Sequence, residues 1–581
     1  MRQNATTIAS FIVSLAFSSA MSGNHLAPLD TLDLDITFIG DREVSLQDAH
    51  KELHWPEPAK LSKPKPVFQY SVLPKRINVQ PEWTKQGPIR LKIEEPLPRL
   101  YKGFVEAGMG NYTSPNFRLE YSELRSRKGS WGIQALHEST NGGFAVDTID
   151  QGFSSNSANA WVKRFYKDEA ITFRSQFTRN HFSPYGSTHD SVGMTALPSY
   201  AANANVWSSG VVLENFDASS EWNHRAEIDY HYLWTNAESS EHNFDVNMAL
   251  LGAIESTPVQ VKFHTNIDRL SRWVEGEPKH TARQAIFDLH PSIRSQFGPV
   301  KTEYGVGLWV DAQGNRPFSF VPEVSASMSL LRDLFIPYIH IHGGVNQNRY
   351  ETALASNPFI TSPSDTSTSF QNTYEKILLE GGMRGSITEA LAFQISASHG
   401  RFDQFMLWGP YDPFGNGAWF QPLYMDLNRT QLQGNATLKL KEAATLFAQA
   451  TAHTYATEDT MYSAAAAWNL PTFELEVDYV HTIKEKIRIQ NQILFQSGRM
   501  GLNASNTNES IESIFSHAGE LIGYQDAMDD FLLWNLQLEY MYNARLNGWL
   551  KINNLLNRDN PLFLGYNSQG LRFQMGANLA F

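Results

Sequence analysis

Two histidines in an alternating stretch are the first residues of this sequence whose type and spacing could do chemistry. His340 and His342 lie in P-Y-I-H-I-H-G-G, where Ile339 and Ile341 occupy the other parity. Residues two apart in an extended strand project from the same face, so both imidazoles would point away from the isoleucines. The pair could chelate a metal, but two imidazoles without a nearby carboxylate are more often hydrogen-bonding groups. The sequence therefore predicts no metal site and no cofactor.

Residues 405–420, F-M-L-W-G-P-Y-D-P-F-G-N-G-A-W-F, have the most unusual composition outside the alternating stretches. Aromatic side chains beside Asp and Asn are typical of sites for sugars or hydrophobic ligands. The alternative is a loop that packs on itself over a mouth or contacts a partner protein. The candidate ligand-binding residues are Trp408, Tyr411, Phe414, Trp419 and Phe420.

Catalytic signatures are absent from the sequence. It contains no Gly-x-Ser-x-Gly, no His-Glu-x-x-His, and no phosphate-loop or dinucleotide fingerprint, so we expect no catalytic residues and no enzyme activity. The chain has no cysteine, which excludes disulfides and thiolate sites. A formal net charge of -13 argues against nucleic acid as a partner.

Alternating apolar and polar residues must position these candidates. The pattern is clear in 116–122, 244–250, 259–268, 473–479, 486–495 and 534–540, and again in the last stretch, Gly570 to Phe581, which ends on an aromatic residue. Many segments run to ten or more residues, the length that crosses a bilayer at a tilt, and they carry charges on the polar face. The sequence therefore predicts an all-β fold, a transmembrane antiparallel β-barrel of about 22 strands preceded by an extended proline-rich tail. A half-buried strand of a soluble β domain is the alternative for any single segment.

Connections alternate between short and long, as expected when one rim faces the periplasm and the other the outside. We expect tight turns at His481–Glu485 and Asn543–Arg545, and long loops at 180–207, 346–374, 403–424 and 497–529. The outer loops are where binding would be built. Aromatic residues near strand ends predict interfacial girdles: Trp222, Trp234, Trp273, Tyr540 and Tyr542.

The chain before the barrel differs in composition. Residues 1–22 read as a secretory signal peptide, with Arg2, a short apolar core and small residues at the cleavage site. Residues 23–99 are proline-rich and predict a periplasmic tail, and residues 100–581 predict the barrel. The tail could dock on a periplasmic partner, lie in the barrel mouth, or be flexible.

Several short stretches resemble TonB-dependent receptor barrels. At the end of the chain these are 553–558 (N-N-L-L-N-R), 570–573 (G-L-R-F) and the terminal Phe581; nearer the start, 39–42, 68–70, 74–75, 95–101 and 124–128 are similar to receptor-like outer-membrane barrels of Bacteroidetes-type bacteria. The resemblance implies an outer-membrane location, lipid as the surroundings, and barrel-assembly machinery that recognises Phe581.

The same resemblance shows a departure. Residues 23–99 are too few for the globular plug of such receptors, so we expect a barrel without a complete plug. The stretch Asp35, Ile36, Thr37, Phe38 and Ile39 resembles a short energy-coupling box. The predicted function is receptor-like or channel-like handling of an unidentified solute or surface macromolecule. The alternative is a non-transporting platform whose tail recruits envelope-assembly or secretion partners.

Overall fold

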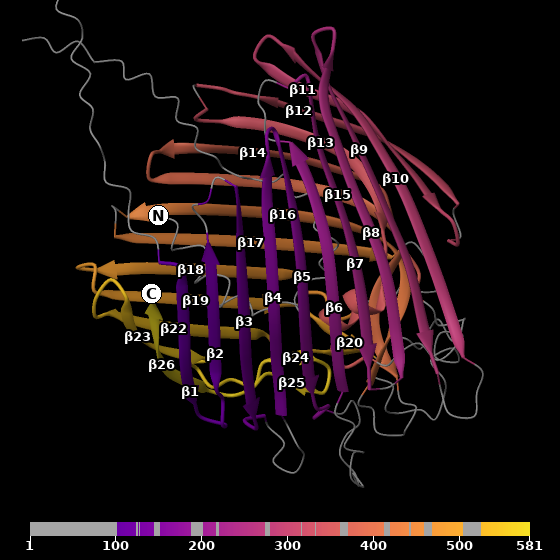
Figure 1. Ribbon diagram of the computed structural model, residues 1–581. Helices are drawn as coiled ribbons and strands as arrows, with labels where there is room; N and C mark the ends of the chain where they lie inside the picture. Colours follow the sequence, from indigo (N-terminus) through magenta and orange to yellow (C-terminus); the bar gives the residue numbers. More distant parts are fainter. Residues whose placement is uncertain are drawn as a thin grey trace, which may run out of the picture. The chain divides into compact units, whose positions relative to one another are not determined.

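In the computed structural model, one antiparallel sheet of 22 strands closes into a barrel (Figure 1). The structure describes residues 101–581 apart from 124–125, 127, 145–151, 187–201, 216–219, 237, 274–278, 315–316, 332, 361–369, 412–418, 441–442, 458–466 and 503–524. The energy-coupling stretch, the signal peptide and the tail lie outside the described residues.

The wall strands are β1 (Gly103–Gly110), β2 (Asn116–Glu123), β3 (Gly129–Asn141), β4 (Gly152–Tyr166), β5 (Glu169–Phe182), β6 (Ala202–Asn215), β7 (Trp222–Thr235), β8 (Ser239–Ile254), β9 (Thr257–Arg272), β10 (His280–Phe297), β11 (Val300–Asp311), β12 (Phe318–Met328), β13 (Ile336–Asn346), β14 (Thr373–Thr388), β15 (Leu391–Tyr411), β16 (Trp419–Leu440), β17 (Ala444–Thr457), β18 (Phe473–Ile483), β19 (Ile487–Ser497), β22 (Phe531–Met541), β23 (Leu546–Asn553) and β26 (Arg572–Ala580). Outside the wall, the described residues form helix α2 (Tyr350–Ser356) and two short antiparallel pairs, β20 (Met500–Leu502) with β21 (Gln525–Ala527) and β24 (Pro561–Phe563) with β25 (Tyr566–Asn567).

The first and last wall strands pair with each other and close the barrel. In this seam Phe104 opposes Ala580, and Gly110 opposes Gln574. Gly103 and Phe581 exchange two backbone hydrogen bonds, of 2.8 and 2.9 Å, at its end. Closure leaves no strand edge unpaired, which a sheet in hydrocarbon requires because lipid offers no partner for N–H and C=O groups. The predicted all-β barrel of about 22 strands is confirmed.

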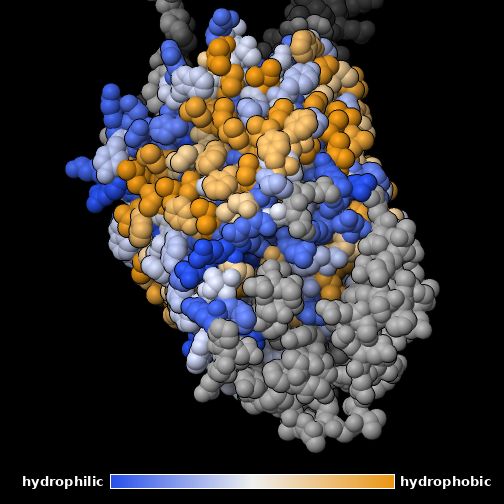
Figure 2. Space-filling model, turned by 90° about the vertical axis from the view of Figure 1, so that its right-hand side faces the viewer, coloured by the Kyte–Doolittle hydropathy of each residue, from blue (hydrophilic) through white to orange (hydrophobic). Residues whose placement is uncertain are grey.

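The apolar face of the strands points outwards. Phe173 and Met248, in the middle of β5 and β8, keep 49% and 45% of their surface exposed. Figure 2 shows apolar side chains gathered in a broad hydrophobic band in the upper part of this view, with a hydrophilic zone below it. No helix in the described part of the chain has the length and apolar composition to cross a bilayer.

The predicted girdle residues lie at strand ends. Trp222, Tyr540 and Tyr542 are exposed at the short-turn ends of their strands, and Trp273 is exposed beyond the opposite end of β9. Trp234 lies next to the last residue of β7 and is partly exposed. Amphipathic rings at both ends of the band match the two interfaces of a membrane.

The two rims differ as the sequence predicts, with one correction. Short turns such as 167–168, 255–256 and 484–486 join the strands at one rim, and long connections such as 183–201 and 347–372 join them at the other. The expected long loop from Asp403 to Tyr424 is wrong, because β15 continues to Tyr411 and β16 begins at Trp419. Both faces of this part of β15 are buried: Phe405 and Leu407 pack in one apolar cluster, and Met406 and Trp408 pack in another. Four apolar residues therefore follow one another, and the alternation that marks a strand is lost in the sequence.

Candidate functional site

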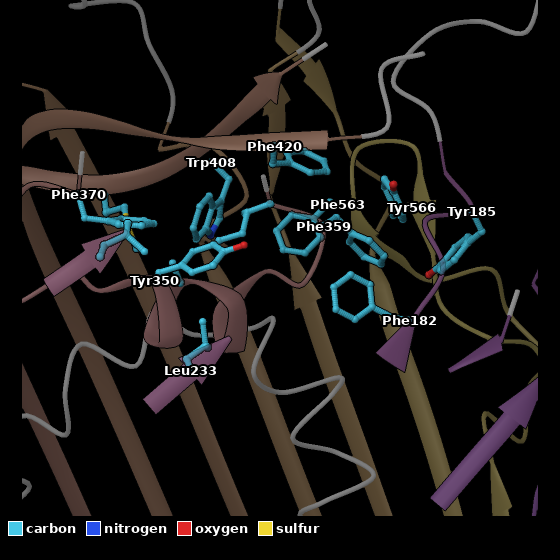
Figure 3. Close-up of a cluster of buried hydrophobic side chains, with 14 residues drawn as sticks. Phe182, Tyr185, Leu233, Tyr350, Phe359, Phe370, Trp408, Phe420, Phe563 and Tyr566 are labelled. Carbon is cyan, nitrogen blue, oxygen red and sulfur yellow. The ribbon is translucent and has the colours of Figure 1, made fainter. Parts of the chain in front are cut away.

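Fourteen buried apolar residues form one cluster at the long-loop rim (Figure 3), which we name the mouth core. Its members are Phe182, Tyr185, Leu233, Leu270, Tyr350, Ala353, Phe359, Ile360, Phe370, Met406, Trp408, Phe420, Phe563 and Tyr566. They come from the outer ends of wall strands and from three connections, 183–201, 347–372 and 554–571. The outer loops therefore fold against the wall and share a dry core with it.

The mouth core joins opposite sides of the barrel. Phe182 is the last residue of β5 and Phe420 is the second residue of β16, and these strands are half a turn apart in the ring of 22. Phe359 lies between them: its ring stacks on Tyr566 at 3.9 Å and meets Phe182 edge-on at 5.9 Å. Phe420 in turn approaches Phe563 at 5.2 Å. Burial of each large aromatic contributes about 1.5–3 kcal/mol, so the cluster holds the loops firmly across the mouth.

Helix α2 places the 347–372 connection in the mouth core. Its face carries Tyr350 and Ala353, both buried, and Pro358 follows the C-cap residue Asn357. A proline cannot continue a helix, which explains the end at Ser356. The Asn357 carboxamide then accepts a 2.9 Å hydrogen bond from the Phe359 N–H, and this turn directs Phe359 into the cluster.

The start of helix α2 is fixed to the wall by a buried carboxylate. Glu241 on β8, 1% exposed, accepts hydrogen bonds from the backbone N–H groups of Tyr350 (2.7 Å) and Glu351 (2.8 Å). These N–H groups have no partner within the helix, so a wall carboxylate satisfies them as a capping residue would.

Glu351 forms a second contact with the wall. Its carboxylate lies 3.3 Å from His231 Nδ1 on β7 and 3.5 Å from Arg349. Burial alone would raise the pKa of Glu351, but the His231 hydrogen bond and the charge of Arg349 outweigh it and hold this pKa below its ordinary value. The docked position of α2 is thus stabilised by an ionised Glu351.

The far end of the same connection is anchored on β11. Asp311 accepts hydrogen bonds from the Asn372 carboxamide (2.6 Å) and the Tyr374 hydroxyl (2.7 Å). The Tyr424 hydroxyl accepts one from the Gln371 N–H at 2.9 Å. The connection is therefore fixed at both ends to different wall strands.

The β24–β25 pair closes a second sector of the mouth. Tyr566 is 0% exposed, and burial raises the pKa of its hydroxyl well above the ordinary value. The Tyr185 hydroxyl donates to the Asn567 carbonyl at 2.7 Å. Arg499 donates to the carbonyls of Pro561 (2.5 Å) and Leu562 (3.3 Å), and its burial lowers its pKa to about 10. The connections 183–201, 498–530 and 554–571 are thus joined by hydrogen bonds.

Polar side chains continue along the lumen face of the wall. His264 lies between Asp245 (2.9 Å) and Asp288 (2.7 Å), and His290 is 2.6 Å from Glu323. Arg174 on β5 pairs with Asp229 on β7 at 2.6 Å. The lumen face of the wall therefore carries charged and hydrogen-bonding groups.

The candidate ligand-binding residues are divided by the structure. Trp408, Trp419 and Phe420 are buried, at 5%, 8% and 2% exposure, and Trp408 and Phe420 belong to the mouth core. Tyr411 ends β15, and Phe414 lies outside the described residues. A ligand role for these five stays a prediction; the buried rings contact the protein's own loops in this state.

His340 and His342 share the lumen face, as expected. Their rings stack at 4.2 Å, and His342 Nε2 lies 3.6 Å from the buried Glu375 carboxylate, a neighbour that the linear sequence does not indicate. Among the described residues no group of three or more His, Cys, Asp or Glu could hold a metal ion.

Most residues of the mouth core were not among the candidates predicted from the sequence. The signal was present as short apolar islands within polar connections, P-F-I at 358–360 and P-L-F-L-G-Y at 561–566. Islands of this kind inside a long outer loop indicate that the loop packs on something rather than standing in water.

The closed wall, its outward apolar band and its unequal rims define the class of the protein: a transmembrane β-barrel of the outer-membrane type. No model of a known family matches the chain, and no curated protein matches it in sequence.

Within that class, solved structures share the fold. The pyoverdine outer membrane receptor FpvA from Pseudomonas aeruginosa PAO1 aligns with TM-score 0.60 and 11% identity over 83% of this chain and 79% of its own. The copper transporter OprC gives 0.60 and 10% over 83% and 81%, and the FrpB iron transporter from Neisseria meningitidis gives 0.61 and 8% over 84% and 82%. At this identity the likeness establishes the receptor-type barrel fold.

Proposed function

We propose that this protein is an outer-membrane receptor-like barrel that handles a solute, and that the mouth core is its closed outer gate. The observation that carries the proposal is the aromatic contact across the mouth, from β5 through Phe359 to β16. A barrel used only as an anchor has no need of a dry core that joins opposite walls at its outer end. The receptors and transporters that share the fold support a transport role.

The order of events follows from this arrangement. A solute arriving from outside meets loops held by buried aromatics and by Glu241, and it gains access to the polar lumen only when they separate. The energy to separate them comes from solute contacts or from a periplasmic partner. The Asp35–Ile39 stretch is the proposed contact for such a partner, and the aromatic residues of 408–420 are the proposed solute contacts once the core opens.

The remaining assignments are part of the same proposal. Residues 1–22 serve as the signal peptide, residues 23–99 as a periplasmic tail without a complete plug, and Phe581 as the contact for barrel-assembly machinery. Phe581 is 52% exposed next to the closing seam, where a second protein can reach it. We propose that the protein has no enzyme activity.

Planar-bilayer conductance tests the proposal. The full chain, a form without residues 23–99, and Phe359→Ala are compared at equal protein density. We expect few openings for the full chain and frequent, larger openings for Phe359→Ala, because the outer gate is weakened. Silence of all three forms would contradict the proposal and favour the alternative, a non-transporting platform whose tail recruits envelope partners.

A further inference from the structure

A row of basic side chains crosses the outer wall on three neighbouring strands. The register pairs His242 of β8 with Arg269 of β9, and Arg269 with Arg283 of β10. All three side chains are exposed, as is Lys279 just before β10. We name His242, Arg269, Arg283 and Lys279 the basic row.

The basic row faces the membrane side of the wall. Side chains alternate between the two faces of a strand, and Asp268 and Gln284, the neighbours of the two arginines, point inwards: Asp268 is buried beside Asn243, and Gln284 donates to the Phe370 carbonyl. The arginines therefore point outwards, with Ile267 and Phe287, which are 43% and 38% exposed.

The row begins where the apolar band ends. Two residues closer to the short-turn rim, the register aligns Phe244, Ile267 and Ala285 in a fully apolar row. Along β9 the outward residues from Val259 to Ile267 are apolar except for Thr265. At about 3.4 Å per residue and a tilt of about 40°, Arg269 stands about 25 Å above Val259, the usual height of the apolar band. The basic row therefore lies at the headgroup level of the outer leaflet.

The two arginines of the row have no compensating charge in the part of the protein that the structure describes. Arg269 and Arg283 oppose each other directly, and like charges in that position repel. Neither guanidinium has an ion-pair partner among the described residues. Their planar forks match the oxygens of a phosphate, and an anion placed between them would remove the repulsion.

Aromatic residues border the row and suit a lipid neighbour. Tyr232 stacks on His242 at 4.7 Å, and the Tyr230 hydroxyl lies 2.8 Å from His242 Nδ1. Trp273, 46% exposed, follows directly after β9. Such rings place an apolar body against acyl chains and a polar edge among headgroups.

We propose that the basic row is a binding site for a phosphorylated lipid headgroup of the outer leaflet. Arg269 and Arg283 hold the phosphate, Lys279 adds charge from above, and the aromatic border receives the sugar or glycerol next to it. The site depends on the orientation of the barrel in the membrane and not on the outer gate, so a failed gating experiment leaves it intact.

Native mass spectrometry of the purified full chain tests the site, with diphosphorylated lipid A as the probe. The variant is Arg269→Gln with Arg283→Gln. The matched control is Lys484→Gln with Lys486→Gln, which removes two exposed cations from the opposite rim. We expect about ten-fold weaker retention of the probe by the variant and no change for the control. Folding of each form is verified by its mobility on unheated gels.

Two further arms identify the bound chemistry. Dephosphorylated lipid A should bind the unmodified protein as weakly as diphosphorylated lipid A binds the variant, and inorganic phosphate at the same concentration should not displace the probe. Equal retention by the variant and the unmodified protein would overturn the proposal. So would equal binding of the dephosphorylated lipid, and displacement by inorganic phosphate would replace a lipid site by a site for free anions.

Discussion

Replacement of Phe359 by alanine should release the outer gate without unfolding the barrel. The ring is 2% exposed and contacts Tyr566 of one loop and Phe182 of the wall, so its loss removes buried area on both sides and leaves a cavity. Substitutions of this kind cost about 3–5 kcal/mol. The Phe359 ring takes no part in the pairing of the wall strands, and the hydrogen bond from the Phe420 N–H to the Phe359 carbonyl is a backbone contact that alanine keeps. The cost therefore falls on loop docking, and the open fraction should rise by at least about 100-fold.

Limited trypsin cleavage measures this opening. Arg349, directly before helix α2, has 15% of its side chain exposed while it pairs with Glu351, so the bond after it is protected in the docked state. When loop opening is fast relative to cleavage, the cleavage rate follows the open population. Appearance of the fragment that ends at Arg349 should be accelerated in Phe359→Ala, while the heat stability of the barrel stays within a few degrees.

The matched control is Phe320→Ala, which removes the same ring from the outer wall, where it is 62% exposed. Its cleavage at Arg349 should equal that of the unmodified protein. If Phe359→Ala is cleaved no faster than Phe320→Ala, the mouth core does not hold the loop and the gate assignment fails.

Three other predictions follow from the wall and its loops. Because the pKa of Glu351 is lowered in the docked state, an ionised Glu351 stabilises docking at pH values above the ordinary glutamate pKa. This contribution is lost as pH falls below about 4, so channel openings in a bilayer should become more frequent there. Glu351→Gln should open more often than the unmodified protein at pH 7 and should lose that part of the pH dependence. Met248→Arg places a charge in the middle of the apolar band and should lower the free energy of unfolding in urea by about 2–4 kcal/mol. Asn247→Arg, on the lumen face, should cost much less; an equal or larger cost for Asn247→Arg would contradict the assignment of Met248 to the lipid face and Asn247 to the lumen face. His264→Ala leaves Asp245 and Asp288 facing each other without the shared imidazole and should lower the free energy of unfolding by about 2 kcal/mol. An unchanged urea midpoint would show that the His264 contacts do not stabilise the wall.

Only part of the candidate site could be predicted, because the sequence shows which residues are neighbours along the chain and not which loops meet in space. Trp408, Trp419 and Phe420 belong to a stretch of unusual, aromatic-rich composition. Such a composition fits exposed residues that bind a ligand as well as it fits residues packed within the protein. Their burial depends on Phe359 and Phe563, which arrive from other loops. In the same way, the carboxylate near His342 belongs to Glu375 on the next strand, and the residues that flank His342 in the sequence do not indicate it.

The sequence by itself determined the wall. A period of two, repeated in strands of membrane-spanning length, assigns the side chains of most strands to lipid or lumen, because a strand has only two faces. The sequence thereby predicted a barrel of about 22 strands, although it missed the outer ends of β15 and β16, and the structure showed the seam that closes it. The tertiary structure alone decided what lies across the mouth and which cations share a row. Those contacts join Phe182 to Phe359, Phe359 to Tyr566, and Arg269 to Arg283, and they depend on loop docking and strand register, which are set by packing between segments remote in sequence and not by the local alternation of residues.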